Sequence, residues 1–319
     1  MESLTEGMKY YIIAGEASGD LHGSNLITEL KKLDTDADFQ GWGGDKMQSA
    51  GVNLGKHYRD LAFMGFTEVV KNLPTIFKNL QFCKQDILNY QPDVLILIDY
   101  PGFNLRIAKW AKQNNFFVIY YISPQVWAWK ESRVKDIKKY IDKMLVILPF
   151  EKEFYKKWDY DVVYVGHPLV EVVESFKLKN ESESESQSSN IIALLPGSRK
   201  QEIQRKLPVM LQTAAHFPEY NFVVAKAPGI EENFYNTFLS SHKNVTTVVN
   251  QTYSLLSKAK AALVTSGTAT LETALFGVPE IVCYKGSSIS YYIAKKLIKL
   301  KYISLVNLIM NKEVVKELI

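Results

Sequence analysis

Short apolar runs alternate with longer amphipathic segments through the first half of the chain. A turn at Gly15–Gly19 opens a predicted helix that continues to about Leu33, and similar helical segments separate the later apolar runs. Strands joined by helices of roughly 10–15 residues are typical of a parallel, doubly wound sheet. The predicted strands of this half are Lys9–Ala14, Asp38–Trp42, Asp93–Ile98, Phe116–Ile122, Met144–Leu148 and Val162–Val165.

The pattern stops at a Ser/Glu-rich segment and then starts again. Residues 174–190 contain almost no large apolar side chains after Phe176, which predicts a solvated linker between a domain at 8–173 and one at 191–319. We therefore expect an α/β protein with two Rossmann-like domains facing a cleft, where the carboxyl ends of the strands bind ligands. The second set of predicted strands is Ile191–Leu195, Phe222–Ala225, Val245–Val248, Ala261–Val264 and Glu280–Cys283.

Composition narrows the class of protein only slightly. The 319 residues carry a net charge of +4, which suits a phosphate-bearing partner or a membrane surface without establishing either. The lysines are scattered and lack a base-stacking aromatic motif, so nucleic acid is not expected as a partner. Cys83 and Cys283 form no CxxC pair, and the start MESLTEGMKYY lacks the apolar region of a signal peptide. We expect a cytoplasmic protein.

The clearest candidate for a ligand site lies within Ala261–Val282. A turn at Ser266–Thr268 separates a predicted strand from a predicted helix at Ala269–Phe276. The free N–H groups and positive dipole at a helix N-terminus favour phosphate. Glu272 follows one turn later, where its carboxylate could accept hydrogen bonds from a ribose diol. The alternative is an ordinary βαβ connection with a Ser/Thr cap.

Three other polar turns follow predicted strands. Gly15–Asp20, with His22 one turn on, lacks the GxGxxG spacing of a dinucleotide site, which disfavours a dehydrogenase. Asp99 ends a buried strand and could act as a general base, although a turn-forming Asp is the alternative. Arg199 follows another strand and could bind phosphate oxygens, whereas its alternative is an ion pair with Glu202.

Several other features have weaker interpretations. Trp127 and Trp129 could line a sugar or lipid pocket or simply pack inside the protein. Neither His22 nor His167 has a second ligand at metal spacing, so we expect no metal site. The Asp34–Asp38 segment resembles a DxD metal motif, but it falls at the sheet edge opposite the ligands and is better explained as a solvated turn.

Two segments combine apolar residues with lysines. Phe63–Leu80 and Tyr291–Tyr302 could form interfacial helices on an anionic membrane, or amphipathic helices that face the core. The membrane interpretation is favoured more for the first segment. Its expected acyl-chain contacts are Met64, Phe66, Val69, Leu73 and Phe77.

Taken together, the motifs resemble those of the lipid-A-disaccharide synthase family. That family consists of inverting glycosyltransferases with the GT-B fold, which act in lipid A and lipopolysaccharide biosynthesis in Gram-negative bacteria. The matching motifs occur in the family's order over nearly the whole chain: GEASGD at Gly15–Asp20, DYPGFN at Asp99–Asn104, SPQVWAW at Ser123–Trp129, LPFE at Leu148–Glu151, VGHP at Val165–Pro168, LLPGSR at Leu194–Arg199 and SGTATLE at Ser266–Glu272.

The resemblance implies that UDP-2,3-diacylglucosamine and 2,3-diacylglucosamine 1-phosphate are joined into a β-1,6-linked disaccharide, with release of UDP and without a metal or cofactor. Asp99 would be the base, supported by Glu16 and His22. The acceptor side would involve Gly15, Ser18, Asn104 and Trp127. The donor would contact Gly197, Ser198, Arg199, Ser266, Gly267, Thr268, Glu272 and Asn307.

The resemblance also implies peripheral attachment to the inner membrane and a homodimer in the full-length protein. Two departures stand out, because Val306 replaces the proline usual before Asn307, and family members normally continue beyond Ile319. We therefore expect a C-terminally shortened chain. The alternatives are a related GT-B enzyme that uses or epimerises UDP-N-acetylglucosamine, and a catalytically silent UDP-sugar-binding protein at the membrane.

Overall fold

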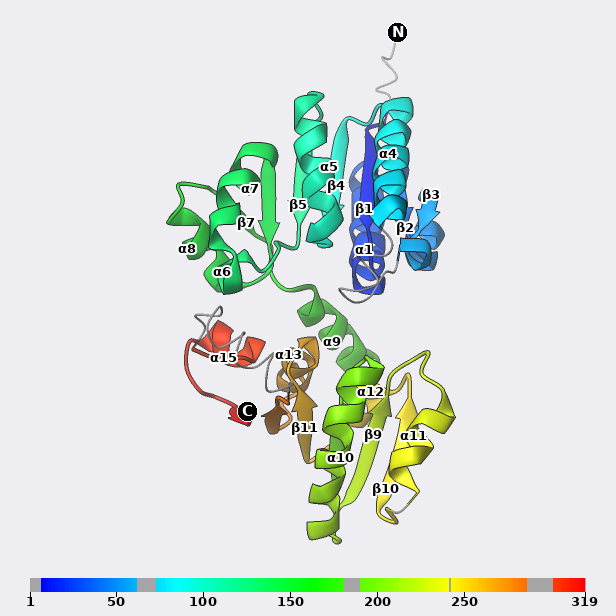
Figure 1. Cartoon of the computed structure of the whole chain (residues 1–319), viewed down its shortest axis with the longest axis vertical. Helices are drawn as coiled ribbons and strands as arrows, with labels where there is room; N and C mark the ends of the chain where they lie inside the picture. The colour runs from blue at the N-terminus through cyan, green and yellow to red at the C-terminus, as the bar shows by residue number, and fades with distance from the viewer. Residues whose placement is uncertain (1–6, 62–72, 181–189, 241, 286–300, 319) are drawn as a thin grey trace. The chain divides into compact units, whose positions relative to one another are not determined.

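The computed structural model describes residues 7–61, 73–180, 190–240, 242–285 and 301–318, which belong to two compact units. The first unit ends at Gly166 and the second begins at His167. Each contains a parallel sheet with helices between its strands (Figure 1), which confirms the predicted α/β class.

The first unit has a sheet whose strand order is β3-β2-β1-β4-β5-β6-β7. All its recorded strand pairs are parallel. The predicted strands are confirmed with shifted ends, whereas β3 was not predicted. The strands are β1 (Lys9–Ala14), β2 (Asp38–Gly43), β3 (Asn53–His57), β4 (Val94–Ile98), β5 (Val118–Tyr121), β6 (Lys143–Val146) and β7 (Val163–Tyr164).

Helices cover both faces of this sheet because its central strands are apolar on both sides. In β4, Leu95 and Leu97 face one core, and Ile96 and Ile98 face the other. The first core includes residues of α4 (Leu73–Tyr90), α5 (Pro101–Gln113), α7 (Val134–Tyr140) and α8 (Pro149–Lys156), and the second includes residues of α1 (Ala17–Leu33) and α2 (Asp45–Ser49). The remaining helical segments are α6 (Val126–Trp129), η1 (Tyr58–Leu61) and η2 (Glu131–Arg133).

The second unit repeats the doubly wound arrangement with the strand order β10-β9-β8-β11-β12-β13. Its strands are β8 (Ile191–Leu195), β9 (Asn221–Lys226), β10 (Val245–Val249), β11 (Ala261–Thr265), β12 (Glu280–Cys283) and β13 (Lys316–Leu318). Its helices are α9 (Pro168–Lys179), α10 (Lys200–His216), α11 (Glu232–Leu239), α12 (Thr252–Leu256), α13 (Thr268–Leu275) and α15 (Leu305–Met310). The last strand, β13, was not predicted.

The boundary between the units differs from the one predicted at residue 173. Helix α9 belongs to the second unit and includes the first residues of the predicted linker. The Phe176 ring packs edge-on against the rings of Tyr253 and Phe276, at centroid distances of 5.5 and 5.9 Å. The Nζ atom of Lys177 donates a hydrogen bond to the carbonyl of Leu275 at 2.7 Å. These contacts attach α9 to the second unit, so the boundary between the units lies before this helix. Residues 181–189 of the predicted linker lie outside the described residues.

Both sheets have a topological switch point between two central strands. In the first unit, β1 and β4 are neighbours, with Ala14 opposite Ile98. In the second, β8 and β11 are neighbours, with Leu195 opposite Val264. Chain segments leave these pairs toward opposite edges of the sheet, so a crevice is expected at their carboxyl ends. The four polar turns predicted from the sequence follow these four strands.

Candidate functional site

The turn after β4 has an unusual backbone. Asp99 and Tyr100 both adopt left-handed conformations, with φ of 44° and 49°. Such angles are uncommon outside glycine and are often associated with functional sites. Two hydrogen bonds fix the backbone carbonyl of Asp99. It accepts one from the Tyr120 hydroxyl at 2.5 Å and one from Asn104 Nδ2 at 2.8 Å. These two side-chain hydrogen bonds thus use the carbonyl of Asp99 and not its carboxylate.

Asn104 has a structural role in the turn, and its predicted contact with the acceptor stays a prediction. Its side chain is fully buried, and Nδ2 also lies 3.2 Å from the Ile98 carbonyl and 3.5 Å from that of Ile13. Asn104 thus joins the carboxyl ends of β1 and β4. The sequence could not distinguish this positioning role from a ligand contact.

Two carboxylates share the switch point of the first unit. Burial and, to a smaller extent, the negative charge of Glu16 raise the pKa of Asp99 to about 6, although the Tyr100 backbone N–H opposes the change. Glu16 is exposed and occupies the N-cap position of α1 without a side-chain capping bond. A carboxyl with a pKa near 6 exchanges protons readily around neutral pH, as a general base requires.

The rest of the turn after β1 serves mainly to build the site. A Cβ on Gly15 would lie 2.3 Å from Tyr100 Cδ1, so the Tyr100 ring needs glycine there. Asp20 is buried and accepts hydrogen bonds from the backbone N–H groups of Gly44 and Met47 at 2.7 and 3.0 Å, which caps α2. Gly15 and Asp20 therefore support the turn rather than offering side chains to a ligand.

Ser18 and His22 lie on the first turns of α1. Ser18 is exposed and available to a ligand. Burial lowers the pKa of His22, and its Nδ1 has no hydrogen-bond partner among the described residues. Burial therefore favours the neutral form of the imidazole. Ser18 and His22 remain predicted site residues.

Trp127 is half-buried and packs within the first unit, while its predicted role in a ligand pocket stays a prediction. Its Nε1 donates to Glu151 Oε1 at 3.2 Å, and its ring meets Phe150 edge-on at 4.9 Å. Glu151 is buried and also accepts from the backbone N–H groups of Ile147 and Leu148. Burial raises the pKa of Glu151 to about 7 despite these hydrogen bonds. This carboxyl received no role in the sequence analysis, although it belongs to the LPFE motif.

The turn after β8 holds a glycine and an exposed arginine. Gly197 has φ of 113°, and a Cβ on it would lie 2.6 Å from Glu202 Oε2. Arg199 Nη1 lies 3.5 Å from Glu202 Oε1, as the alternative interpretation predicted, and the Ser198 N–H donates to the same carboxylate at 3.3 Å. The Arg199 side chain is 65% exposed, so this weak pair leaves its guanidinium accessible to phosphate.

The turn after β11 opens α13 as the sequence predicted. Gly267 is exposed, and apart from its chain neighbours no described atom lies within 4 Å of where its Cβ would be. Thr268 is also exposed, whereas Ser266 Oγ donates to the Ile303 carbonyl at 3.3 Å. The backbone at Gly267 and Thr268 is thus open to an anion.

Glu272 has a partner that the sequence did not suggest. The Tyr253 hydroxyl, on α12, donates to Glu272 Oε1 at 2.8 Å. Burial raises the pKa of Glu272, and this hydrogen bond partly opposes the effect. Among the described residues, no recorded hydrogen bond reaches Oε2. That oxygen is available to a ligand hydroxyl.

Asn307 is fully buried within the second unit, and its predicted contact with the donor stays a prediction. Its Nδ2 donates to the Val315 carbonyl and to Glu317 Oε1, at 2.9 and 2.8 Å, while Oδ1 accepts from the N–H groups of Val314 and Val315. Burial raises the pKa of Glu317, but hydrogen bonds from Ile303, Ser304 and Asn307 lower it to a greater extent. This network joins α15 to β13 and supports the Ser266 turn through Ile303.

The predicted membrane segment is only partly described. Met64, Phe66 and Val69 lie outside the described residues, and Leu73 begins α4. Leu80 and Ile87 pack in the core, as a core-facing helix requires, yet Phe77 is 62% exposed. Residues 291–300 of the second segment also lie outside. No described helix combines the length and apolar character needed to cross a membrane.

The Asp34–Asp38 segment forms a turn between α1 and β2, at the end of the sheet opposite the switch-point turns. Asp34 Oδ2 accepts from the Met8 N–H at 3.0 Å. The solvated-turn interpretation is confirmed.

Two doubly wound parallel sheets, each with polar turns at its switch point, define a protein of the GT-B class. Two solved structures share this fold. One is UDP-GlcNAc 2-epimerase from Neisseria meningitidis bound to UDP-GlcNAc (TM-score 0.63, 15% identity, 95% of this chain and 90% of that one). The other is the glycotransferase of kitacinnamycin (TM-score 0.63, 11% identity, 98% and 86%). At these identities the likeness concerns the fold alone.

Sequence comparison identifies the family. The family model described as lipid-A-disaccharide synthetase matches residues 10–319. The lipid-A-disaccharide synthase of Syntrophus aciditrophicus (strain SB) is 43% identical over 317 residues, covering 97% of this chain and 83% of that protein. Lipid-A-disaccharide synthase 1 of Legionella pneumophila (strain Lens) is 42% identical, covering 96% and 82%. The chain belongs to the lipid-A-disaccharide synthase family, a family of glycosyltransferases.

Proposed function

We propose that this protein transfers the diacylglucosamine of UDP-2,3-diacylglucosamine to the 6-hydroxyl of 2,3-diacylglucosamine 1-phosphate, without a metal ion. The observation that carries the proposal is the Asp99 carboxyl, held at the switch point of the first unit with a pKa of about 6 beside Glu16. Family membership favours transfer over epimerisation or silent binding.

The reaction is a single displacement. Asp99 accepts the proton of the 6-hydroxyl while that oxygen forms a bond to the anomeric carbon of the donor. The bond from this carbon to the UDP oxygen breaks, and its electron pair leaves with UDP. Attack opposite the leaving group inverts the anomeric centre and gives the β-1,6 linkage. Asp99 gains the proton, which solvent removes after release.

The second unit stabilises the charge that develops on UDP. The accessible guanidinium of Arg199 and the open backbone at Gly267 and Thr268 supply positive charge and N–H donors. The free Oε2 of Glu272 accepts from the ribose hydroxyls, with its position fixed by Tyr253. Gly197 and Ser198 shape the turn that carries Arg199.

The substrates' acyl chains require access to a lipid surface. We place the protein in the cytoplasm, peripheral to the inner membrane, with Phe77 and the preceding segment that contains Met64, Phe66, Val69 and Leu73 as its apolar contact. The exposed Phe77 ring on α4 supports this placement. A homodimer of the full-length protein belongs to the same proposal.

The test uses both diacylated substrates in detergent with EDTA and detects the disaccharide by mass spectrometry. We expect product with the wild-type protein and a loss of at least about 100-fold in kcat for Asp99→Asn, the range of general-base catalysis. Asn104→Ser, which keeps a polar group beneath the turn, should retain more activity than Asp99→Asn. Product retained in Asp99→Asn would remove Asp99 from the base role. Product abolished by EDTA and restored by a divalent cation would refute metal independence.

A further inference from the structure

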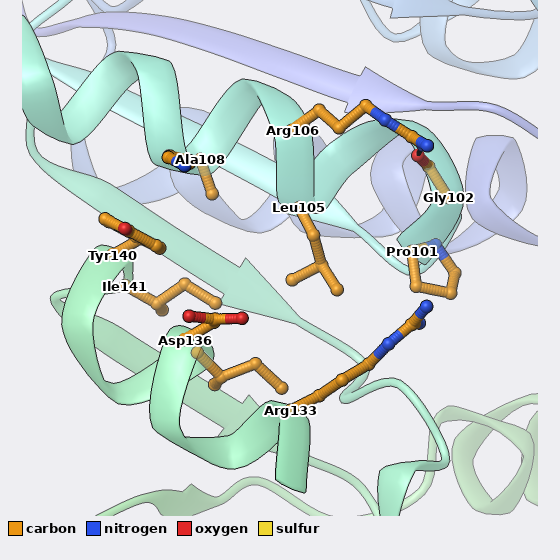
Figure 2. Close-up of a pocket in the computed structure, with 11 residues that line it drawn as sticks. Pro101, Gly102, Leu105, Arg106, Ala108, Arg133, Asp136, Tyr140 and Ile141 are labelled. Carbon is orange, nitrogen blue, oxygen red and sulfur yellow. Dashed lines mark hydrogen bonds between the residues drawn. The ribbon is translucent and has the colours of Figure 1, made fainter. Parts of the chain in front are cut away.

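A groove in the first unit, outside the residues assigned above, lies between α5 and α7 (Figure 2). It has a volume of about 240 Å³. One end is formed by Pro101 and Gly102 and the other by Tyr140, while Leu105 and Ile137 supply apolar walls. Because Pro101 is two residues after Asp99, the Cα atoms of these residues are at most about 7 Å apart. The groove therefore begins beside the proposed base.

Two guanidinium groups lie at the end of the groove near the base. Figure 2 shows Arg106 of α5 directed toward Gly102, and Arg133 directed toward Pro101 from the opposite wall. Arg106 donates one hydrogen bond to the Gly102 carbonyl, and Arg133 stacks on the exposed Trp129 ring at 5.6 Å. A guanidinium has five N–H donors, and within the described part of the chain most of those of Arg106 and Arg133 are unused.

The positive charge of these groups is not neutralised within the described residues. Neither arginine forms an ion pair with a carboxylate there, although Asp136 also lines the groove. Lys109 lines it as well and lies 5.8 Å from the Tyr140 ring. Three cations and one carboxylate make the groove electropositive, which favours an anionic ligand.

The acceptor turns have the opposite charge. The segments 15–22 and 99–104 contain three carboxylates and neither lysine nor arginine. The proposed acceptor carries a phosphate, so cations close to these turns would favour its binding. Arginine pairs bind phosphate oxygens in a bidentate manner.

We propose that the end of this groove between Arg106 and Arg133 binds the 1-phosphate of the acceptor, which directs the 6-hydroxyl of the same sugar toward Asp99. This inference rests on the proposed function. The groove is smaller than typical drug-sized pockets, so it accommodates a phosphosugar headgroup and not the acyl chains. The two arginines select the phosphorylated acceptor over its dephosphorylated form.

Steady-state kinetics with two acceptors test the proposal. For Arg106→Gln and Arg133→Gln, we expect the KM for 2,3-diacylglucosamine 1-phosphate to rise at least about tenfold each, the worth of one charge-assisted hydrogen bond. The KM for the UDP-sugar and the low rate with dephosphorylated acceptor should not change. The control Lys135→Gln removes an exposed positive charge of α7 outside the groove and should leave all these parameters unchanged. An unaltered preference for the phosphorylated acceptor in the double arginine variant would overturn the proposal.

A binding measurement separates this proposal from the proposed function. By calorimetry, glucosamine 1-phosphate should bind the wild-type and Lys135→Gln proteins but not the double arginine variant, while glucosamine should bind none of them. If wild-type protein forms no disaccharide yet binds glucosamine 1-phosphate through the arginines, the function fails and the phosphate site stands. If disaccharide forms but glucosamine 1-phosphate binding does not depend on the arginines, the site fails alone.

The anion could also be free phosphate or a membrane headgroup. Inorganic phosphate should inhibit competitively against the acceptor in wild-type protein, and much less in the double variant. Equal inhibition by phosphate in both proteins would count against the site. If the double variant lost binding to vesicles of phosphatidylcholine with phosphatidylglycerol but kept its acceptor preference, the arginines would serve the membrane and the proposal would be wrong.

Discussion

Glu16 provides a direct test of how the site prepares its base. The charge of this exposed carboxylate contributes to the raised pKa of Asp99, together with the larger effect of burial. Glu16→Gln removes the charge and nearly keeps the shape. The pKa of Asp99 should fall, and because a general base acts in its deprotonated form, activity should persist to lower pH.

The expected size follows from the pKa of Asp99. With a pKa of about 6, roughly one tenth of the Asp99 side chains are deprotonated at pH 5. A single like charge near solvent contributes from a few tenths to about one pKa unit. In Glu16→Gln, the active fraction at pH 5 should therefore rise to between about one sixth and one half of the plateau.

The assay is the pH dependence of kcat/KM for the acceptor between pH 4.5 and 8.5, normalised to the plateau of each variant. Normalisation separates the change in pKa from any contact that Glu16 makes with substrate. Glu153→Gln, which neutralises an exposed carboxylate of α8, should leave the acid limb where it is in wild type. An acid limb that stays fixed, or moves to higher pH, in Glu16→Gln would refute the electrostatic coupling.

Three further predictions concern Asn104 and Tyr253, which lie beneath or beside the proposed sites, and Glu280, at the opposite end of the second sheet. Asn104→Ala removes the side chain that donates to the carbonyls of Ile13, Ile98 and Asp99. It should lower the free energy of unfolding in urea by about 2 kcal/mol, and it should affect kcat more than the KM for the donor. An unchanged kcat would contradict the positioning role of Asn104. Tyr253→Phe frees Glu272 and should raise the UDP-sugar KM several-fold without altering the acceptor KM, as initial rates will show. Burial raises the pKa of Glu280 to about 8, and its carboxyl has no hydrogen-bond partner among the described residues. Glu280 therefore stays protonated in the folded state at pH values where it is ionised in the unfolded chain. The free energy of unfolding should fall as the pH rises above about 4.5, until the folded state also loses the proton near pH 8. Between pH 5.5 and 7.5, the free energy of unfolding in urea should fall by about 1–2 kcal/mol less in Glu280→Gln than in wild type, after allowance for partial hydration. Equal dependence of stability on pH in the two proteins would contradict this prediction.

Much of the fold could be predicted because buried parallel strands are continuous apolar runs. Val94–Ile98 and Ile191–Leu195 illustrate this, since each lies inside a sheet covered by helices. The two missed strands, Asn53–His57 and Lys316–Leu318, are edge strands with polar side chains. Their pairing depends on backbone hydrogen bonds to a neighbour that lies far away in sequence.

The candidate site was predictable to the level of turns, but not to the level of individual side-chain roles. Strand order makes Asp99 and Glu16 neighbours, and alternating strands and helices already predicted that their turns share one edge. Motif position could not reveal that Asn104 and Asn307 point inward, because their partners are backbone carbonyls and N–H groups. Tyr253 carries no motif of its own, so its bond to Glu272 was not predictable.

The pair of carboxylates at the first switch point also has a pharmacological consequence. An acceptor analogue with a primary amine in place of its 6-hydroxyl would place an ammonium group between Glu16 and Asp99. A protonated amine has no lone pair with which to attack the donor, so the analogue would occupy the acceptor site without reacting. Its affinity should increase as the pH rises past 6, because Asp99 then carries its full charge. The feature that prepares the base would thus make the enzyme selectively sensitive to cationic inhibitors.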